Sequence, residues 1–277
     1  MGLFDFFKKK RKIKVGLALG GGGARGIAHL GAIKAFEEYG IKFDYIAGTS
    51  AGSLVGALYA YGLGADRLIE IAKSLNIKDI KTNKISFIPS KTDGIENIIK
   101  ENIGDVSFKD LKTPFCAVAV DIKTGNEVHI KSGNVSKAVA GSCAVPGVFN
   151  PVDFETFRLM DGGLQNTIPS DVVKTMGADV VIAVDVNPSR GYGTESTKII
   201  DLLSASIRIL MKSNAVKGKL YANIILEPNT KRFKSTKLAG LDEMIKEGYD
   251  SAKVNMPSIL KLLNIKPRLM KKQKIKK

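Results

Sequence analysis

Residues 43–62 read FDYIAGTSAGSLVGALYAYG, with the pentapeptide GTSAG at positions 48–52. The residues before the pentapeptide form a short apolar run typical of a strand, and those after it favour a helix. A serine with a glycine two positions away on each side is typical of a strained strand-to-helix turn that holds the hydroxyl at its tip. Gly48 and Gly52 therefore predict that Ser50 is presented as a nucleophile.

The stretch before this turn has the same order of elements. Apolar residues alternate through residues 13–19, which predicts a strand, and four glycines follow at positions 20–23. Residues 24–40 carry apolar side chains at helical spacing and end at a glycine, which predicts a helix. Two successive strand–turn–helix units predict an α/β protein whose central, mostly parallel sheet has helices on both faces.

The rest of the chain predicts further strands and helices. Strands are expected within 114–130, before the turn at Asp161, and at 179–186. Helices are expected at 66–75, 94–103, 137–145, 196–216 and within 234–265, and residues 187–195 are typical of a loop. These elements continue the alternation of strands and helices that indicates an α/β fold.

The sequence GGGGARG before the first helix has three possible interpretations. A phosphate-binding P-loop requires Lys and then Ser or Thr after its last glycine, whereas Ile27 follows here. Gly21, Gly23 and Gly26 fit a dinucleotide-binding pattern, with Asp44 beyond them as a ribose-binding acid. The third interpretation is an oxyanion hole, in which N–H groups of consecutive glycines stabilise a developing negative charge. GTSAG begins only 22 residues after the loop, and an acyl-transfer enzyme needs both features at neighbouring strand ends, which favours the third.

An attacking serine needs a base, and histidine is the usual one. The chain has two histidines. His29 falls on the face of the first predicted helix that is expected to be buried, where a packed structural histidine is the better interpretation. His129 lies in an alternating strand, away from any turn motif. Neither lies in the late strand-end loop where the histidine of a serine hydrolase is expected.

Three aspartates lie at or near strand ends. Asp121 opens an ordinary turn, and Asp185 is flanked by two valines, where it can bond a backbone amide. Asp161 begins the sequence DGG, and the two glycines leave room for another loop to approach. Burial raises the pKa of a carboxyl group and makes it a better base near neutral pH. We therefore expect a dyad in which Ser50 attacks and Asp161 takes its proton directly.

The order GGGGARG, GTSAG, DGG resembles that of the patatin-like phospholipases. The resemblance runs from about Lys14 to about Lys174, and it includes AVAGSCAVPGVFNPV ahead of the aspartate turn. Similarity to this family implies a three-layer α/β/α fold and a serine–aspartate dyad without histidine. It also implies hydrolysis of lipid acyl esters without calcium.

The family's functional residues carry over by position. Ser50 matches the nucleophile and Asp161 the base, and amides around Gly22, Gly23 and Ala24 match the oxyanion hole. Gly20 stands where some members have Asp. The residues that support these motifs are Gly21, Arg25, Gly26, Gly48, Gly52, Gly162 and Gly163.

No internal repeat or low-complexity linker divides the chain, so one domain with two tails is expected. The expected boundaries are a tail at 1–13, a patatin-like domain at 14–174, the C-terminal part of the same fold with additional helices at 175–265, and a basic tail at 266–277.

The net charge of +16 is concentrated in the tails. Residues 1–14 carry six Lys or Arg and one Asp, and residues 266–277 carry seven Lys or Arg and no acid. Such tails indicate an anionic partner, either phospholipid headgroups or nucleic acid. Leucine and phenylalanines beside the first basic run favour lipid, and the basic runs lack interleaved aromatics and any nucleic-acid-binding motif. We expect a lipid ester substrate and an anionic membrane surface as partners, no nucleic acid, and a cytoplasmic protein peripheral on the inner face of the membrane.

Two cysteines, Cys116 and Cys143, form neither a disulfide framework nor a zinc pattern. No metal and no cofactor are expected. Three other functions stay open at this point. The first is a carboxylesterase or acyltransferase acting on soluble substrates. The second is a catalytically silent scaffold on a membrane or nucleic acid, and the third is a dinucleotide-binding oxidoreductase.

Overall fold

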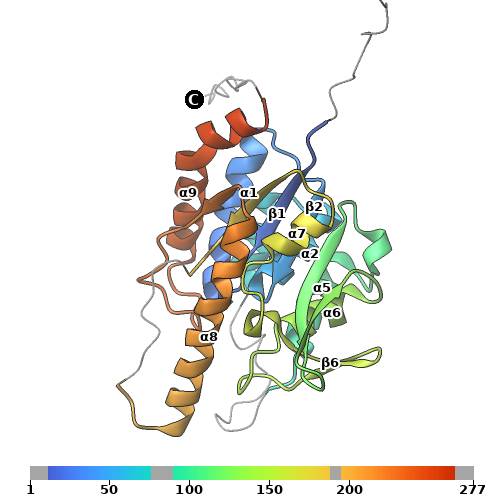
Figure 1. Cartoon of the computed structure of the whole chain (residues 1–277), viewed down its shortest axis with the longest axis vertical. Coiled ribbons are helices and arrows are strands. Elements are labelled where there is room, and N and C mark those ends of the chain that lie inside the picture. Colours follow the sequence, from blue (N-terminus) through green and yellow to red (C-terminus); the bar gives the residue numbers. More distant parts are fainter. Residues whose placement is uncertain (1–11, 76–89, 188–194, 266–277) are drawn as a thin grey trace, which may run out of the picture.

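The computed structural model describes residues 12–75, 90–187 and 195–265. Residues 1–11 of the N-terminal tail, the C-terminal tail and most of the loop expected at 187–195 lie outside the described residues. At the centre is an eight-stranded sheet with helices on both sides (Figure 1). The strands are β1 (Val15–Leu19), β2 (Tyr45–Thr49), β3 (Phe115–Asp121), β4 (Asn126–Ile130), β5 (Val152–Phe154), β6 (Phe157–Asp161), β7 (Val180–Val184) and β8 (Ile224–Leu226).

The strand order confirms a mostly parallel sheet. Strands β3, β2, β1, β7 and β8 lie side by side and all run parallel. Strands β4 and β6 pair with β3 in the antiparallel sense, and β5 pairs antiparallel with β6. The carboxyl ends of β1, β2, β3 and β7 therefore meet at one edge of the sheet, which is where ligands bind in open α/β sheets.

Helices cover both faces of this sheet. They are α1 (Ala28–Glu38), α2 (Ala51–Tyr61), α3 (Ala65–Ser74), α5 (Asp93–Ile103), α6 (Val135–Ser142), α7 (Ser170–Thr175), α8 (Ile199–Tyr221) and α9 (Leu241–Leu262). Three short 3-10 turns are η1 (Gly23–Ile27), η2 (Phe108–Asp110) and η3 (Gly162–Leu164). The expected α/β/α arrangement in three layers is confirmed.

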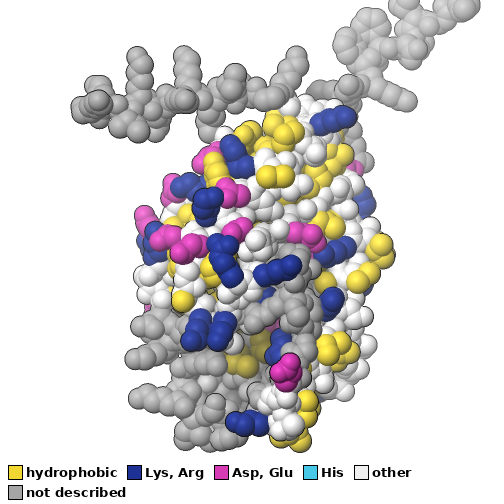
Figure 2. Space-filling model, turned by 90° about the vertical axis from the view of Figure 1, so that its left-hand side faces the viewer, with side chains coloured by type: hydrophobic (Ala, Val, Ile, Leu, Met, Phe, Trp, Pro, Cys, Tyr) yellow, Lys and Arg dark blue, Asp and Glu magenta, His cyan; other side chains and the backbone are white. Residues whose placement is uncertain are grey.

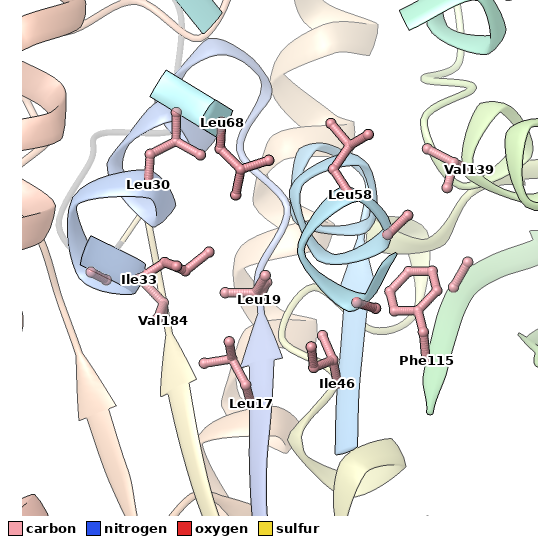
Figure 3. Close-up of a cluster of buried hydrophobic side chains, with 14 of the residues drawn as sticks. Leu17, Leu19, Leu30, Ile33, Ile46, Leu58, Leu68, Phe115, Val139 and Val184 are labelled. Carbon is pink, nitrogen blue, oxygen red and sulfur yellow. The ribbon is translucent and has the colours of Figure 1, made fainter. Parts of the chain in front are cut away.

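Side chains along β1 point alternately to the two faces of the sheet, so this strand contributes to the core on both faces. Leu17 and Leu19 point to one face, where they meet Leu30 and Ile33 of α1 (Figure 3). Ala18 points to the other face and belongs to a smaller cluster with the valines of α7. All five residues of β1 are buried, as expected for a strand covered on both sides.

The outermost layer is held by a close helix crossing. Helix α9 packs across α1, and two glycines lie where the helix backbones approach. A Cβ on Gly31 would lie 1.8 Å from the carbonyl oxygen of Ile245, and one on Gly248 would lie 1.8 Å from that of Ala28. No side chain fits at either position, so the crossing requires glycine on both helices.

Several element boundaries differ from those expected. The helix expected at 24–40 begins as the 3-10 turn η1, because the glycine loop curls before α1 starts. Helix α8 continues to Tyr221, five residues beyond the expected end, and the last helix starts only at Leu241. The short elements β5, β8 and α7 were not expected. No helix in the described ranges has the length and hydropathy that a membrane crossing requires.

Candidate active site

Ser50 stands alone between a strand and a helix. Strand β2 ends at Thr49 and α2 begins at Ala51. The backbone of Ser50 has φ 54° and ψ −125°, which is a strained conformation for a residue with a side chain. Its N–H donates to Ser142 Oγ at 2.9 Å, and Ser142 Oγ donates in turn to the Val118 carbonyl oxygen at 2.6 Å. The turn predicted from GTSAG is present, and α6 and β3 brace it.

The two glycines of GTSAG allow the turn to pack against the sheet. A Cβ on Gly48 would lie 2.3 Å from the carbonyl oxygen of Gly52. A Cβ on Gly52 would lie 2.1 Å from the carbonyl oxygen of Leu19, at the end of β1. Side chains at these positions would separate the helix from the strand ends, so both glycines are needed to keep the serine at the sheet edge.

Strand pairing explains why a serine and an aspartate that are distant in sequence come together. Thr49, the last residue of β2, pairs with Val118 of β3, and Asp161, the last residue of β6, pairs with Ala119. Strand β4 occupies the opposite edge of β3 along the same residues. Strands β2 and β6 therefore share one edge of β3, run toward each other and meet end to end. Both chains turn away at the meeting point, which leaves Ser50 beside Asp161.

The carboxyl group of Asp161 is almost completely enclosed, with 1% of the residue exposed. Burial raises its pKa to about 6, against the opposing effects of the Ser50 hydroxyl and the Gly163 N–H. That N–H donates to Oδ1 at 2.8 Å. Oδ2 is buried and accepts no well-formed hydrogen bond from any residue that the structure describes. A carboxylate with one oxygen held and the other open beside a hydroxyl is arranged to accept a proton.

The glycine loop lies directly against this turn. A Cβ on Gly21 would lie 3.3 Å from the Ser50 Cβ, and one on Gly26 would lie 2.6 Å from the Ala51 Cβ. The two sequence motifs are thus in contact, as expected from their positions after neighbouring parallel strands. Gly162 of the DGG turn is equally confined, because a Cβ there would lie 2.2 Å from the Val118 carbonyl oxygen.

The three amides expected in the oxyanion hole are not equivalent. The N–H groups of Gly22 and Gly23 donate to none of the residues in the described ranges. The N–H of Ala24 donates to the carbonyl oxygen of Ser235 at 2.8 Å. Gly23 has φ 56° and faces the same carbonyl, which a Cβ would approach to 2.4 Å. Gly22 and Gly23 therefore have donors to offer in this structure, whereas the Ala24 amide holds the loop.

Arg25 and Asn187 hold the glycine loop in place, and the sequence had not identified Asn187. Arg25 is buried, and its guanidinium donates to Asn187 Oδ1. The amide nitrogen of Asn187 donates to the Gly21 carbonyl oxygen. Asn187 follows β7 in a stretch expected only to be a loop, and no motif marks it. Ser142 lies in a stretch that resembles the family, but nothing in the sequence indicated its hydrogen bond to Ser50.

The histidines have other partners. His29 is fully buried, and burial lowers its pKa to about 4, so it is neutral near pH 7. Its Nε2 lies 2.8 Å from the Gly20 carbonyl oxygen, to which it donates. His129 is exposed and lies 2.6 Å from a carboxylate oxygen of Glu127. His29 thus supports the start of the glycine loop, and His129 makes a surface hydrogen bond to Glu127.

The two other strand-end aspartates have structural roles. Asp121 accepts a hydrogen bond from the Thr124 hydroxyl at 2.9 Å and another from the Arg158 N–H at 3.0 Å. These bonds hold the pKa of its carboxyl below the ordinary value. Asp185 pairs with Lys219 at 3.0 Å and accepts the Asn187 N–H at 2.8 Å. Asp161 is thus the aspartate of the three that the fold brings beside Ser50.

Comparison with known proteins identifies the family. The family model described as patatin-like phospholipase matches residues 17–174, which is more than half of the chain. The chain belongs to the patatin-like phospholipases. Ser50, Asp161 and the glycine loop all lie within the matched residues.

Individual relatives support this family assignment. An uncharacterized NTE family protein of Mycobacterium tuberculosis is 36% identical over 180 residues, which are 64% of this chain and 50% of that protein. A lysophospholipase nte1 of Aspergillus fumigatus is 37% identical over 196 residues, covering 66% of this chain and 13% of that protein. The chain spans about half the length, or less, of these curated relatives. Among solved structures, VipD from Legionella pneumophila shares the fold with a TM-score of 0.54 at 16% identity, covering 89% of this chain and 67% of that one.

The cysteines of this patatin-like chain are buried in the core. Cys143 lies next to the serine turn, with its Sγ 3.8 Å from the Ser53 hydroxyl, and Cys116 lies inside β3. Burial raises the pKa of both thiols. The described parts of the chain contain no group of three or more His, Cys, Asp or Glu positioned to hold a metal ion.

Proposed function

We propose that this chain is a serine acyl hydrolase that cleaves fatty acyl esters of lipids through a dyad of Ser50 and Asp161. The observation that carries the proposal is the end-to-end meeting of β2 and β6 on one edge of β3. It brings a strained serine and an enclosed carboxyl group together at the carboxyl ends of the strands. Membership of the patatin-like phospholipases and similarity to a lysophospholipase support a lipid ester as substrate.

The reaction begins with attack of Ser50 Oγ on the ester carbonyl carbon. The hydroxyl proton passes to Asp161 Oδ2, which has no competing donor of good geometry among the described residues. A pKa of about 6 lets this carboxylate be ionised at neutral pH and still accept a proton in the transition state. Collapse of the tetrahedral intermediate releases the alcohol or lysolipid, which takes the proton from Asp161.

The glycine loop stabilises the negative charge that develops on the ester oxygen. We assign this role to the N–H groups of Gly22 and Gly23, with the Ala24 N–H holding the loop through Ser235. One such donor lowers the barrier by roughly 3–4 kcal/mol in acyl transfer. In the second half of the reaction Asp161 takes a proton from water, the hydroxide attacks the acyl-enzyme, and the fatty acid leaves as Ser50 regains its proton.

Labelling with a fluorophosphonate probe tests the dyad, because the probe reacts with an activated serine. Ser50→Ala removes the nucleophile and should abolish labelling, and Asp161→Asn should slow it by about 10²–10⁴-fold because the base is lost. Asp121→Asn, at another strand end, is the matched control and should label normally. Normal labelling of Asp161→Asn would overturn the assigned base, and loss of labelling in a folded His29→Ala variant would indicate a histidine mechanism.

The class of substrate needs a separate measurement. A lipid hydrolase should turn over an ester faster once the ester forms micelles, whereas an esterase for soluble substrates should follow the monomer concentration. Release of fatty acid from phospholipid vesicles should require Ser50. Labelling without any phospholipid turnover would confirm the dyad and favour a soluble ester or acyl acceptor.

A further inference from the structure

Helix α8 carries a stripe of apolar side chains that face solvent. Their exposed fractions range from 46% for Leu202 to 78% for Leu220. The stripe consists of Ile199, Leu202, Leu203, Ile209, Leu210, Val216, Leu220 and Tyr221. Because most successive members are one, three or four positions apart, the residues lie on one side of the helix. A row of exposed apolar side chains on one side of a water-facing helix indicates an interaction site.

The opposite side of α8 rests on the turn that holds Asp161. The Met211 side chain covers Gly163, where a Cβ would lie 2.2 Å from its Cε. The Thr167 hydroxyl donates to the Met211 carbonyl oxygen at 2.7 Å, and the Asn214 side chain donates to the Leu164 carbonyl oxygen. The apolar stripe is therefore carried by an element that is fixed to the proposed catalytic base.

Charge along α8 distinguishes between possible partners. The helix contains four basic residues and one acidic residue, Asp201. Lys217 and Lys219 bind carboxylates of the protein body. Lys212 is one turn from both Ile209 and Val216 and so borders the stripe, and Arg208 lies one turn before Lys212, on the side of the helix away from the stripe. An apolar stripe bordered by a cation fits an anionic lipid surface. Two copies of the chain packed through this face would bring the same cation of each copy together, which opposes a dimer.

The position of the stripe agrees with this interpretation. Figure 1 shows α8 running to the lower end of the molecule, the end toward which β1 points. In Figure 2 hydrophobic side chains reach that lower end beside Lys and Arg side chains. Exposed Ile122 follows β3 at the same sheet edge, with Lys123 next to it. Apolar and basic side chains thus gather around the edge where Ser50 lies.

We propose that α8 docks the protein on an anionic phospholipid membrane, with its apolar stripe lying among the headgroups and the first part of the acyl chains. The membrane then faces the sheet edge that holds Ser50, so that an ester can enter without crossing water. The biological purpose of this docking rests on the proposed lipid hydrolase function. The docking itself is a binding event that can be measured separately.

The chain lacks tryptophan, so a single introduced indole reports on its own surroundings. Leu203→Trp places the reporter on the stripe, and Val254→Trp places it on α9, where Val254 is 79% exposed. Vesicles of phosphatidylcholine and phosphatidylglycerol should shift the emission of Leu203→Trp to shorter wavelength, and lipids brominated on their acyl chains should quench it. The emission of Val254→Trp should stay unchanged. An unshifted Leu203→Trp protein that still sediments with vesicles would overturn the proposal.

A shift that grows with protein concentration and needs no vesicles would also overturn the proposal, in favour of association between copies.

The strength of binding to vesicles gives an independent readout. Leu203→Gln combined with Leu210→Gln should weaken partition into anionic vesicles about tenfold or more, because two apolar side chains are lost from the contact. Val254→Gln is the matched control and should bind as the wild type does. Raised salt keeps the contribution of the basic tails small in all samples.

Turnover of a short, soluble ester separates this proposal from the proposed function. The double variant should keep that turnover, because neither leucine touches the dyad. If no protein hydrolyses any ester and the Leu203→Trp shift persists, docking stands and the hydrolase function fails. If ester hydrolysis is normal and no shift is seen, the hydrolase function stands and docking through α8 fails.

Discussion

Backbones approach closely in two regions of this molecule, the crossing of α1 with α9 and the turns around Ser50. At the crossing, Gly31 and Gly248 let two helices meet, and the side chains around them are apolar. At the turns, glycines bring strand ends and helix starts together around buried Ser50 and Asp161. In both regions glycine allows a close approach of backbones, but the energetic consequences differ. At the crossing it increases stability, whereas at the turns it holds polar groups whose burial costs stability.

The largest expected effect is on the crossing. Gly248→Val places a side chain against the Ala28 carbonyl oxygen, so the helices must separate. We expect the free energy of unfolding to fall by about 3–5 kcal/mol, measured by urea denaturation, with normal turnover by the protein that remains folded. Val254→Ala, on the exposed side of α9, should change it by less than about 0.5 kcal/mol. A Gly248→Val variant as stable as the wild type would show that the fold does not depend on the close crossing of α1 and α9.

The opposite effect is expected at the turns. The folded pKa of Asp161 is about 6, above the ordinary value of 3.8, so the stability it contributes is present below about pH 4 and lost as the pH rises through 6. Asp161→Asn cannot ionise, and it should be more stable than the wild type by up to about 3 kcal/mol at pH 8 and by almost nothing at pH 4. Thermal unfolding at the two pH values measures this. An Asp161→Asn variant less stable than the wild type at pH 8 would contradict the view that burying the Asp161 carboxylate costs stability.

The same pKa sets a pH dependence of the reaction. The proposed base, Asp161, can accept a proton only when ionised, so kcat/KM on a soluble ester should be constant above about pH 7 and fall tenfold per pH unit well below 6. Asp121→Asn should show the same profile. A flat profile between pH 5 and 8 would mean that another group accepts the proton.

A smaller effect is expected where the glycine loop is held. Asn187→Ala removes the hydrogen bond to the Gly21 carbonyl oxygen and one that Asn187 accepts from the Arg25 guanidinium. We expect kcat to fall about three- to tenfold with little change in KM, because a loosened loop stabilises the transition state less well. A rise in KM alone would assign Asn187 to substrate binding and not to loop position.

The smallest effect is expected for His129, which lies outside both regions. His129→Gln removes an exposed partner of Glu127, while Lys217 and Asn166 continue to hold that carboxylate. Stability should change by less than about 0.5 kcal/mol and turnover by less than twofold. A large loss of turnover would place a histidine in the mechanism after all.

The glycines of the two regions also differ in how far sequence predicted them. Those at the turns belong to short motifs, GGGGARG, GTSAG and DGG, in which local geometry and chemistry coincide, so the sequence identified them. Gly31 and Gly248 stand alone inside helices, and their need arises only from a partner helix more than 200 residues away. No local pattern records such a contact.

Contacts between residues that are distant in sequence also limited what could be predicted within the candidate site. The parallel units β1–α1 and β2–α2 follow from periodicity, and Ser50 and Asp161 follow from turn chemistry. The meeting of β2 and β6 depends on the register of two strands on β3, which pairing energies across the whole sheet decide. Ser142 and Asn187 each act through two side-chain hydrogen bonds to residues distant in sequence, so the local sequence did not indicate the role of either residue.

The loop contacts also set the order in which the candidate site can assemble during synthesis. The side chain that binds the glycine loop comes 166 residues after Gly21, and β7, which flanks β1, comes later than the whole dyad. A ribosome that adds about 5–20 residues per second needs roughly ten seconds or more to cover that distance. Until then the glycine loop lacks the side chain that holds it, although Ser50 and Asp161 have both been synthesised.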